Sequence, residues 1–261
     1  MGNKPRQPSA TINQCPTEEI VTGMEHFFGD RALKLLSRAK GRPYLYLSLT
    51  PVDVDGGDDI VDVANPGVID LLRNPPNYRE GGWNIYRTEP RHTPDGLVSE
   101  FEVATLRDTQ RLELLKNGHL ELSIKIDQRR FDIEYVRKDG QNHPTLYLYP
   151  LCEIPLNFLR LCKDIRQEYK TDSLAIIRMG LYNISGYSLC AYGKNTEGYK
   201  RQWEEGNFPL WEEDHLILST IKASTGFEPG QLAKRLAEDL WSKFGFEDPP
   251  PLFDEQGGFR P

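Results

Sequence analysis

The most constraining feature of this sequence is the dipeptide Asn117-Gly118, which separates two apolar-patterned runs. Asn-Gly supplies the positive φ angles of a type I′ turn, whose twist matches the two strands that it joins. Between residues 120 and 126, apolar and polar side chains then alternate strictly. This period of two predicts a strand with one face in the core and the other face, which carries Glu121 and Lys125, in water.

The same kind of pattern predicts the remaining elements. Strands are expected at 43–50, 174–182 and 215–221, within an antiparallel meander from 83 to 149, and in a second hairpin that joins 131–136 to 145–149. Helices are expected at 17–28, 30–36, 66–72, 154–169 and from 229 onward, before a loose proline- and glycine-containing tail. Gly29-Asp30 is expected to break the first two helices apart, with Leu33, Leu35 and Leu36 of the second facing inward. The fold class is therefore α+β, with a largely antiparallel sheet and helices packed on it. We expect residues 1–41 to form an extended lead-in with a helical junction, and residues 42–261 to form one domain.

Composition limits the kind of protein and its partners. The chain has 261 residues, of which 38% are hydrophobic and 27% charged, as in globular proteins. Its net charge of −7 disfavours broad contact with a phosphate backbone. Four cysteines without a CxxC pair are typical of free thiols in a reducing compartment; they are Cys15, Cys152, Cys162 and Cys190. With no signal-peptide pattern and no membrane-length apolar run, we expect a cytoplasmic protein without membrane contact.

The N-terminal stretch departs from this acidic balance. Residues 1–43 hold seven Lys and Arg against four Asp and Glu. A positive cluster beside an expected junction suggests a surface that touches a partner protein, and a solvated helix face is the alternative. The candidate partner-binding residues are Arg31, Lys34, Arg38 and Arg42.

The sequence does not match the motifs of common metal-binding, catalytic and phosphate-binding sites. The acidic loop that begins at Asp53 has Asp58 where a calcium loop needs glycine and Ala64 where it needs glutamate. The five histidines lack the spacing of a helical zinc site, and a G-x-S-x-G elbow is absent. A phosphate loop before Lys194 fails because Ser188 stands in place of the first glycine. We therefore assign no catalytic, cofactor-binding or metal-binding residue.

Aromatic and cationic residues alternate between 187 and 211. Aromatics interleaved with cations can stack nucleic-acid bases or hold a partner. Acidic residues in the same stretch, such as Glu204 and Glu205, oppose a polyanion. Packing of the aromatics under a long loop is the alternative.

Four short segments carry a family resemblance: RPYLYL at 42–47, DLLRNPP at 70–76, GGWN at 81–84 and WSKFGFE at 241–247. In these segments the chain resembles the C-terminal region of bacterial proteins that begin with a Schlafen AlbA-type putative DNA-binding domain. The resemblance covers most of residues 42–248. The DNA-binding domain has no counterpart in this sequence, so the resemblance assigns nucleic-acid binding to none of these residues.

The resemblance and the failed motifs lead to one functional expectation and two alternatives. We expect a non-enzymatic accessory module that mediates assembly or sensing for a nucleic-acid-binding partner, without direct nucleic-acid contact of its own. That partner is a separate protein or the missing N-terminal domain. The first alternative is a hydrolase or nuclease with an active site of unfamiliar pattern, and the second is a small-ligand sensor.

Overall fold

The computed structural model describes residues 28–35, 37, 41–52, 60–103, 108–126, 135–136, 142–169, 173–190 and 210–260. Residues 28–35 are helical, and the bounded helices are α2 (Pro66–Arg73), α3 (Leu148–Glu168) and α5 (Pro229–Lys243). The strands of the main sheet are β1 (Tyr44–Pro51), β2 (Arg91–Thr93), β3 (Gly96–Val103), β4 (Asp108–Leu115), β5 (Leu120–Lys125), β9 (Ala175–Tyr182), β11 (His215–Ile217) and β12 (Ile221–Ala223). Short strands form two further pairs: β6 (Tyr135–Val136) with β7 (Asn142–His143), and β8 (Thr145–Tyr147) with β10 (Ser188–Cys190).

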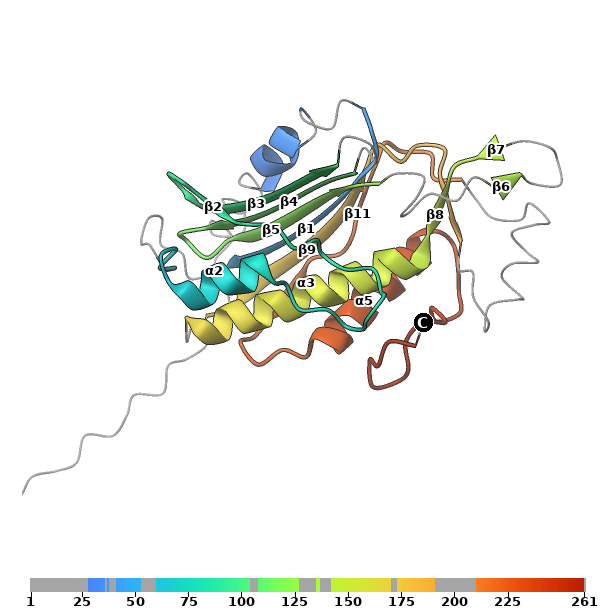
Figure 1. Ribbon diagram of the computed structural model, residues 1–261. Helices are drawn as coiled ribbons and strands as arrows, with labels where there is room; N and C mark the ends of the chain where they lie inside the picture. Colours follow the sequence, from blue (N-terminus) through green and yellow to red (C-terminus); the bar gives the residue numbers. More distant parts are fainter. Residues whose placement is uncertain are drawn as a thin grey trace, which may run out of the picture.

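The main sheet has eight strands in the order β11-β9-β1-β5-β4-β3-β2, with β12 also paired to β9. Every pairing within this sheet is antiparallel. Figure 1 shows α2, α3 and α5 across one face, while the helical segment 28–35 lies on the opposite face. We call these the inner and the outer face. The expected α+β fold with a largely antiparallel sheet is confirmed.

The core lies between the inner face and the helices α2, α3 and α5. Apolar side chains from alternate positions of the central strands point into it, including Leu45 and Leu47 of β1 and Leu122 of β5, each 0% exposed. The helices contribute stripes at helical spacing, such as Leu236 and Leu240 of α5. Burial of the even-numbered residues 120–126, expected from the alternation, is confirmed.

The β4–β5 hairpin forms where Asn117-Gly118 predicts it, but with a different turn. Gly118 has φ +81°, whereas Asn117 has no positive φ angle. Leu115 accepts a hydrogen bond from the Gly118 N–H at 2.9 Å and donates one to the His119 carbonyl at 2.8 Å. This pattern is a three-residue loop with glycine at the left-handed position, so the expected type I′ turn is wrong.

The segment before α3 also differs from the expectation. Residues 145–147 were expected to pair with 131–136, but β8 pairs in parallel with β10, and β6 pairs with β7 instead. The helix then begins at Leu148 rather than near residue 154. Its first nine residues are all buried, so no helical period of apolar and polar side chains marks its start.

Two C-terminal expectations need correction. The strand expected at 215–221 is divided into β11 and β12, and between them the Ser219 N–H donates to Asp239 Oδ2 at 2.5 Å. The tail is ordered and packed rather than loose. Phe259 is 4% exposed and forms a β-bridge with Phe253, and its carbonyl accepts from the Tyr78 hydroxyl at 2.9 Å. These contacts hold residues 252–259 against the domain.

Candidate functional site

The outer face of the sheet is polar, yet it is largely buried. Glu121, Ser123 and Lys125 are only 7–8% exposed, so their expected exposure is wrong. The alternation of residues 120–126 identified the apolar face correctly, but it could not show that another element covers the polar face. For Glu121 that element is the helical segment 28–35.

The helical segment meets the sheet through a stripe at helical spacing, formed by Phe28, Arg31, Ala32 and Leu35. Phe28 packs with Val52 and Ile176 at one end, and Leu35 packs with three tyrosines at the other. These three are Tyr44, Tyr46 and Tyr182. Both apolar clusters are separate from the main core.

The sequence had suggested a helix break at Gly29-Asp30 and inward positions for Leu33, Leu35 and Leu36. Residues 29 and 30 are instead helical, and Leu33 is 65% exposed. Both differences follow from the position of Phe28. The helix runs on from residue 28 without a break, and the face that includes Phe28 places Arg31, Ala32 and Leu35, rather than Leu33, against the sheet. The side chain of residue 36 lies outside the described residues, as does the helix expected before residue 28.

Two glutamates lie directly opposite each other beneath this helical segment. In the β4–β5 register Glu113 pairs with Glu121, and both side chains point to the outer face. Like charges in directly opposed positions destabilise a sheet unless a cation lies between them. Arg31 supplies this cation: its Nη2 lies 2.5 Å from Glu113 Oε2, and its Nε donates to Glu121 Oε2 at 2.8 Å. The three side chains are only 6–12% exposed, so the cluster is largely removed from water.

The ion pairs continue toward the edge of the sheet. Arg111 contacts Glu113 at 3.0 Å and also pairs with Glu100, which contacts Arg91 at 2.7 Å. The side chains become more exposed along this path, from 16% for Arg111 to 63% for Arg91. Positive and negative charges therefore alternate from the helical segment to β2, and we call this series the charge ladder. Its members in spatial order are Glu121, Arg31, Glu113, Arg111, Glu100 and Arg91.

Hydrogen bonds fix the buried end of the ladder. The Tyr46 hydroxyl donates to Glu121 Oε2 at 2.9 Å, and His119 Nε2 lies 3.2 Å from the same oxygen. The other ring nitrogen of His119 lies 2.7 Å from Thr50 Oγ1. An ionised Glu121 only accepts hydrogen bonds, so a neutral His119 carries its proton on Nε2 and accepts from Thr50 at Nδ1.

Burial and charge act together on the pKa values here. Burial lowers the pKa of His119, which outweighs the attraction of Glu121, so the ring is neutral. Burial alone would raise the pKa of Glu121, but hydrogen bonds from His119 and Arg31 outweigh burial and lower it. Burial also opposes the charge of Arg31, yet the two carboxylates raise its pKa, while burial and the Glu121 charge raise that of Tyr46. The cluster is thus held as one guanidinium between two carboxylates.

The order Thr50–His119–Glu121 has the residue types of a nucleophile, a base and a carboxylate. Thr50, however, is 6% exposed on the central strand β1, and His119 is 0% exposed. A general base must reach a substrate proton within hydrogen-bond distance. The arrangement therefore fits a structural role better than a catalytic one.

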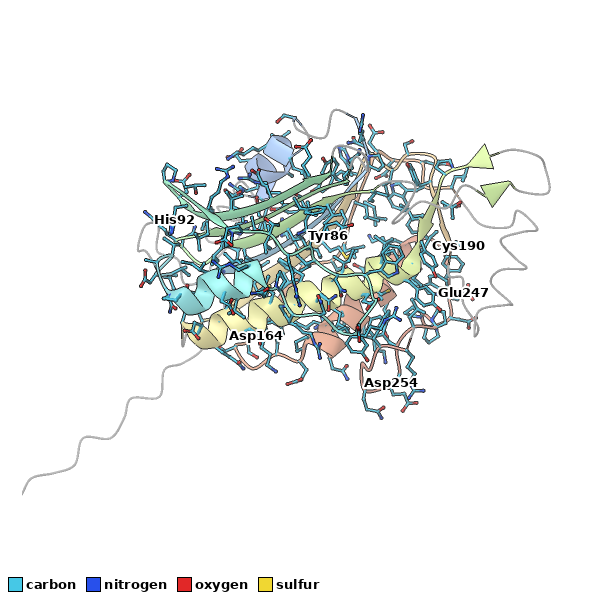
Figure 2. All side chains as sticks on the ribbon, viewed as in Figure 1. Tyr86, His92, Asp164, Cys190, Glu247 and Asp254 are labelled. Atoms are coloured by element: carbon cyan, nitrogen blue, oxygen red, sulfur yellow. The ribbon has the colours of Figure 1, made fainter. Side chains whose placement is uncertain are left out.

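A cavity of about 280 Å³ opens beside the helical segment on the Arg111 side of the ladder. Leu35 and Tyr44 form its apolar wall, while Glu100, Glu102 and Arg111 contribute charged groups. Figure 2 shows side chains between the sheet and the helical segment, on the side of the sheet away from α3 and α5. The cavity joins the apolar contact of Leu35 to the exposed half of the ladder.

The candidate partner-binding residues differ in their positions. Arg31 is used within the chain, where it neutralises Glu113 and Glu121. Lys34 and Arg42 are exposed, and the Arg42 carbonyl accepts from the Asn183 side chain at 2.7 Å. Arg38 lies outside the described residues. The structure therefore brings Arg31 into the site and leaves Lys34 and Arg42 at the surface.

One feature of the sequence indicates the glutamates of the site, which no motif predicts. The Asn117-Gly118 turn sets the register of the hairpin, and that register places Glu113 opposite Glu121. An opposed glutamate pair already requires a nearby cation. Which cation fills the gap depends on a contact across 82 residues, which no local pattern encodes.

Other candidate residues gave no further site. Within the described ranges, no group of three or more His, Cys, Asp and Glu could hold a metal ion. Cys152, Cys162 and Cys190 are buried free thiols, and burial raises the pKa of Cys190 to about 12. Cys15, the acidic residues 53–59 and the stretch 191–209 lie outside the described residues. No described helix is long and apolar enough to cross a membrane.

A second ion pair, between a partly exposed arginine and a buried glutamate, lies on the other side of the sheet. Glu153 of α3 is 0% exposed and accepts two hydrogen bonds from Arg79, each 3.0 Å long. A Cβ atom on Gly82 would lie 2.0 Å from Glu153 Oε1, so any larger residue there would displace this carboxylate. Asn157 donates to the Trp83 carbonyl at 3.0 Å. These contacts fasten the segment after α2 onto α3.

Comparison of the chain with protein-family models, with curated proteins and with solved structures found no match.

Proposed function

We propose that this chain is a non-enzymatic interaction module, and that its partner meets it at the outer face of the sheet. The attachment of the helical segment 28–35 carries the proposal. Ion pairs to Glu113 and Glu121 and two small apolar clusters hold the segment on a polar face, apart from the main core. Apolar anchors beside charged pairs are typical of interfaces between proteins.

Exposed apolar side chains on the same side of the sheet support this proposal. Leu33 is 65% exposed on the helical segment, and Ile217 is 48% exposed on β11. Ile217 pairs with Gly180, and its side chain lies on the outer face. A single exposed leucine is common, but two large apolar side chains exposed on the same side of the sheet as the charge ladder and the cavity favour a docking surface.

The partner that we propose is a nucleic-acid-binding protein or domain. The resemblance of residues 42–248 to the region that follows an AlbA-type domain supports this class of partner. The net charge of −7 favours a module that leaves nucleic-acid contact to its partner. Three buried free thiols support a reducing compartment, so we propose that this assembly acts in the cytoplasm.

Photo-crosslinking from position 33 tests the proposal. A benzophenone amino acid replaces Leu33 in the full chain, which is expressed in its source organism and irradiated. A matched probe replaces Asp70 of α2, whose side chain is also 65% exposed but lies on the inner-face side. We expect a defined protein adduct from position 33 that position 70 does not give. A third probe replaces Ile217 of β11, which stays on the sheet if the helical segment is displaced. Equal adducts from all positions, or none from positions 33 and 217, would contradict the proposal.

Nucleic-acid binding by the purified chain is the complementary measurement. Fluorescence anisotropy with labelled single- and double-stranded oligonucleotides near 0.15 M salt should show no salt-sensitive binding at micromolar protein. A phosphate-binding surface would lose affinity steeply with added salt. Binding that disappears in a Lys34→Ala, Arg38→Ala and Arg42→Ala variant would place nucleic-acid contact on this chain and overturn the proposal.

A hydrolase is the second candidate, because Thr50, His119 and Glu121 lie in hydrogen-bonded order. The burial of Thr50 weighs against it. A Thr50→Val variant separates the two functions, since it removes the hydroxyl and keeps the shape. Hydrolysis of ester, phosphodiester or peptide probes by the wild type that this variant lacks would favour the hydrolase.

A further inference from the structure

The acidic pair of the outer face is built by the sheet itself. Glu113 is held by Arg111 at 3.0 Å, and Glu121 is held by Tyr46 at 2.9 Å and by His119 at 3.2 Å. All three supporting residues belong to β1, β4 and the β4–β5 hairpin, and none belongs to the helical segment. Groups outside the helical segment therefore help to orient both carboxylates, and the gap between them fits one guanidinium.

Apolar contacts flank this gap on both sides. Phe28 meets Val52 and Ile176 at one end, and Leu35 meets the tyrosine cluster of β1 and β9 at the other. The three anchors Phe28, Arg31 and Leu35 occupy positions i, i+3 and i+7 of one helical face. Anchors at this spacing are how an amphipathic helix binds a groove in another protein.

We propose that the outer face of the sheet is a receptor for an amphipathic helix with an aromatic residue, an arginine and a leucine at positions i, i+3 and i+7. Residues 28–35 fill this receptor as a tethered internal ligand, and a partner helix of the same pattern takes their place. This inference rests on the proposed function, because it specifies the partner's contacting element.

The chemistry of the gap selects arginine over lysine. Arg31 donates from Nε and from Nη2 and so reaches both glutamates at once. A guanidinium presents its donors in a fixed planar fork, whereas an ammonium acts as a compact point charge. A lysine helix would keep the charge but lose the simultaneous contact with the two carboxylates.

The tethered helix is held weakly enough for a competing helix to replace it. A helical stretch of eight residues on its own is marginal in water, so residues 28–35 depend on their contacts with the sheet. Its apolar contacts belong to two small clusters, each with at most four buried residues, rather than to the main core. The tether gives the segment an effective concentration in the millimolar range, so a free competitor binds well only when the internal helix is weakened.

The test uses a fluorescein-labelled synthetic peptide with the sequence of residues 25–40, added to the full-length Arg31→Ala chain. This chain keeps the sheet and loses the central anchor of its own helix. We expect saturable binding by anisotropy, at least tenfold tighter than to the wild-type chain. A peptide with the Arg31→Lys change should bind at least tenfold more weakly than the arginine peptide.

A second variant of the full chain tests whether the glutamates are responsible for the binding of the peptide. In an Arg31→Ala, Glu121→Gln chain, the preference for the arginine peptide should fall to less than threefold. If Arg31→Ala fails to fold, as judged by circular dichroism, Phe28→Ala serves as the weakened acceptor, because it removes an anchor and leaves the glutamates paired.

Equal binding of the arginine and lysine peptides, or no binding to either folded acceptor, would overturn the inference. These failures differ from a failure of the proposed function. Crosslinking from position 33 with no peptide binding would mean that the partner contacts the outward side of the segment without displacing it. Peptide binding with no crosslinked partner would leave the receptor in place and remove the proposed interaction.

Discussion

Both faces of the sheet are buried, but the inner face is covered through apolar packing and the outer face through ion pairs. On the inner face, side chains such as Leu47 and Leu122 pack against helices and are 0% exposed. On the outer face, Glu113 and Glu121 are covered by a helical segment that must bring a guanidinium with it. Apolar burial is non-directional, whereas an acidic pair in a site of low polarity requires one charge at one place. The inner face therefore provides stability, and the outer face selects which helix can pack on it.

The largest expected effect is on the inner face. Leu122→Ala should lower the free energy of unfolding by about 2–5 kcal/mol, because it removes a fully buried side chain and leaves a cavity. Guanidinium denaturation followed by circular dichroism measures this change. Ser123→Ala, on the opposite face of the same strand, is the control and should cost far less. An unchanged midpoint for Leu122→Ala would contradict the inner-face assignment.

Arg31→Ala should rank second, with a loss of about 1–3 kcal/mol, because it leaves two buried carboxylates without their shared cation. Adding Glu121→Gln should recover part of this loss, since one of the unpaired charges is then removed. The same denaturation measurement on both single variants and the double variant gives the coupling energy. Additive losses would show that Arg31 and Glu121 do not interact.

Acid should destabilise the protein through the titratable groups of the outer face, whereas the apolar packing of the inner face should not depend on pH. The folded protein keeps His119 neutral because its pKa is lowered, whereas the unfolded chain binds a proton below about pH 6.5. Stability should therefore fall as the pH drops below 6.5. A further loss should begin near pH 4.5, where the unfolded chain protonates Glu121 while the folded protein keeps its carboxylate ionised. The midpoint of thermal unfolding, measured from pH 8 to pH 4, records both steps.

His119→Gln is the control for this pH dependence. An amide can keep one hydrogen bond toward Glu121 and does not titrate, so the step between pH 6.5 and 4.5 should shrink. His92 and His215 are exposed and remain in the variant. An identical pH profile in the variant and the wild type would assign the step to other groups.

The smallest effect should come from the exposed end of the ladder. Arg91→Ala breaks an ion pair of the same kind as Arg31→Ala, but its side chain is 63% exposed. Exposed pairs contribute about 0–1 kcal/mol. The loss should shrink further at 0.5 M sodium chloride, whereas the effect of Arg31→Ala should persist. A loss at Arg91 as large as that at Arg31 would remove the distinction between the two ends.

The sequence predicted those parts of the fold that local patterns encode. Pro66 and Pro229 mark the first turns of α2 and α5, and Asn117-Gly118 marks the hairpin. The start of α3 at Leu148 does not follow from the pattern, because the first turns of this helix are buried on all sides and carry no polar stripe. Of the candidate site, only Arg31 was singled out, and for an external contact. Its actual partners depend on the tertiary placement of a short helix, which no period of two or 3.6 residues can show.

The position of β1 in the sheet has a consequence for how the chain folds during synthesis. This strand lies between β5 and β9, so its second neighbour begins at residue 175, more than a hundred residues later in the chain. At about 5–20 residues per second, β9 leaves the ribosome on the order of 10 s after β1. Both edges of β1 are open until β5 is made, and one edge stays open from then until β9 is made. An open edge can pair with another nascent chain. The yield of native protein should therefore be sensitive to the speed of translation between residues 51 and 175.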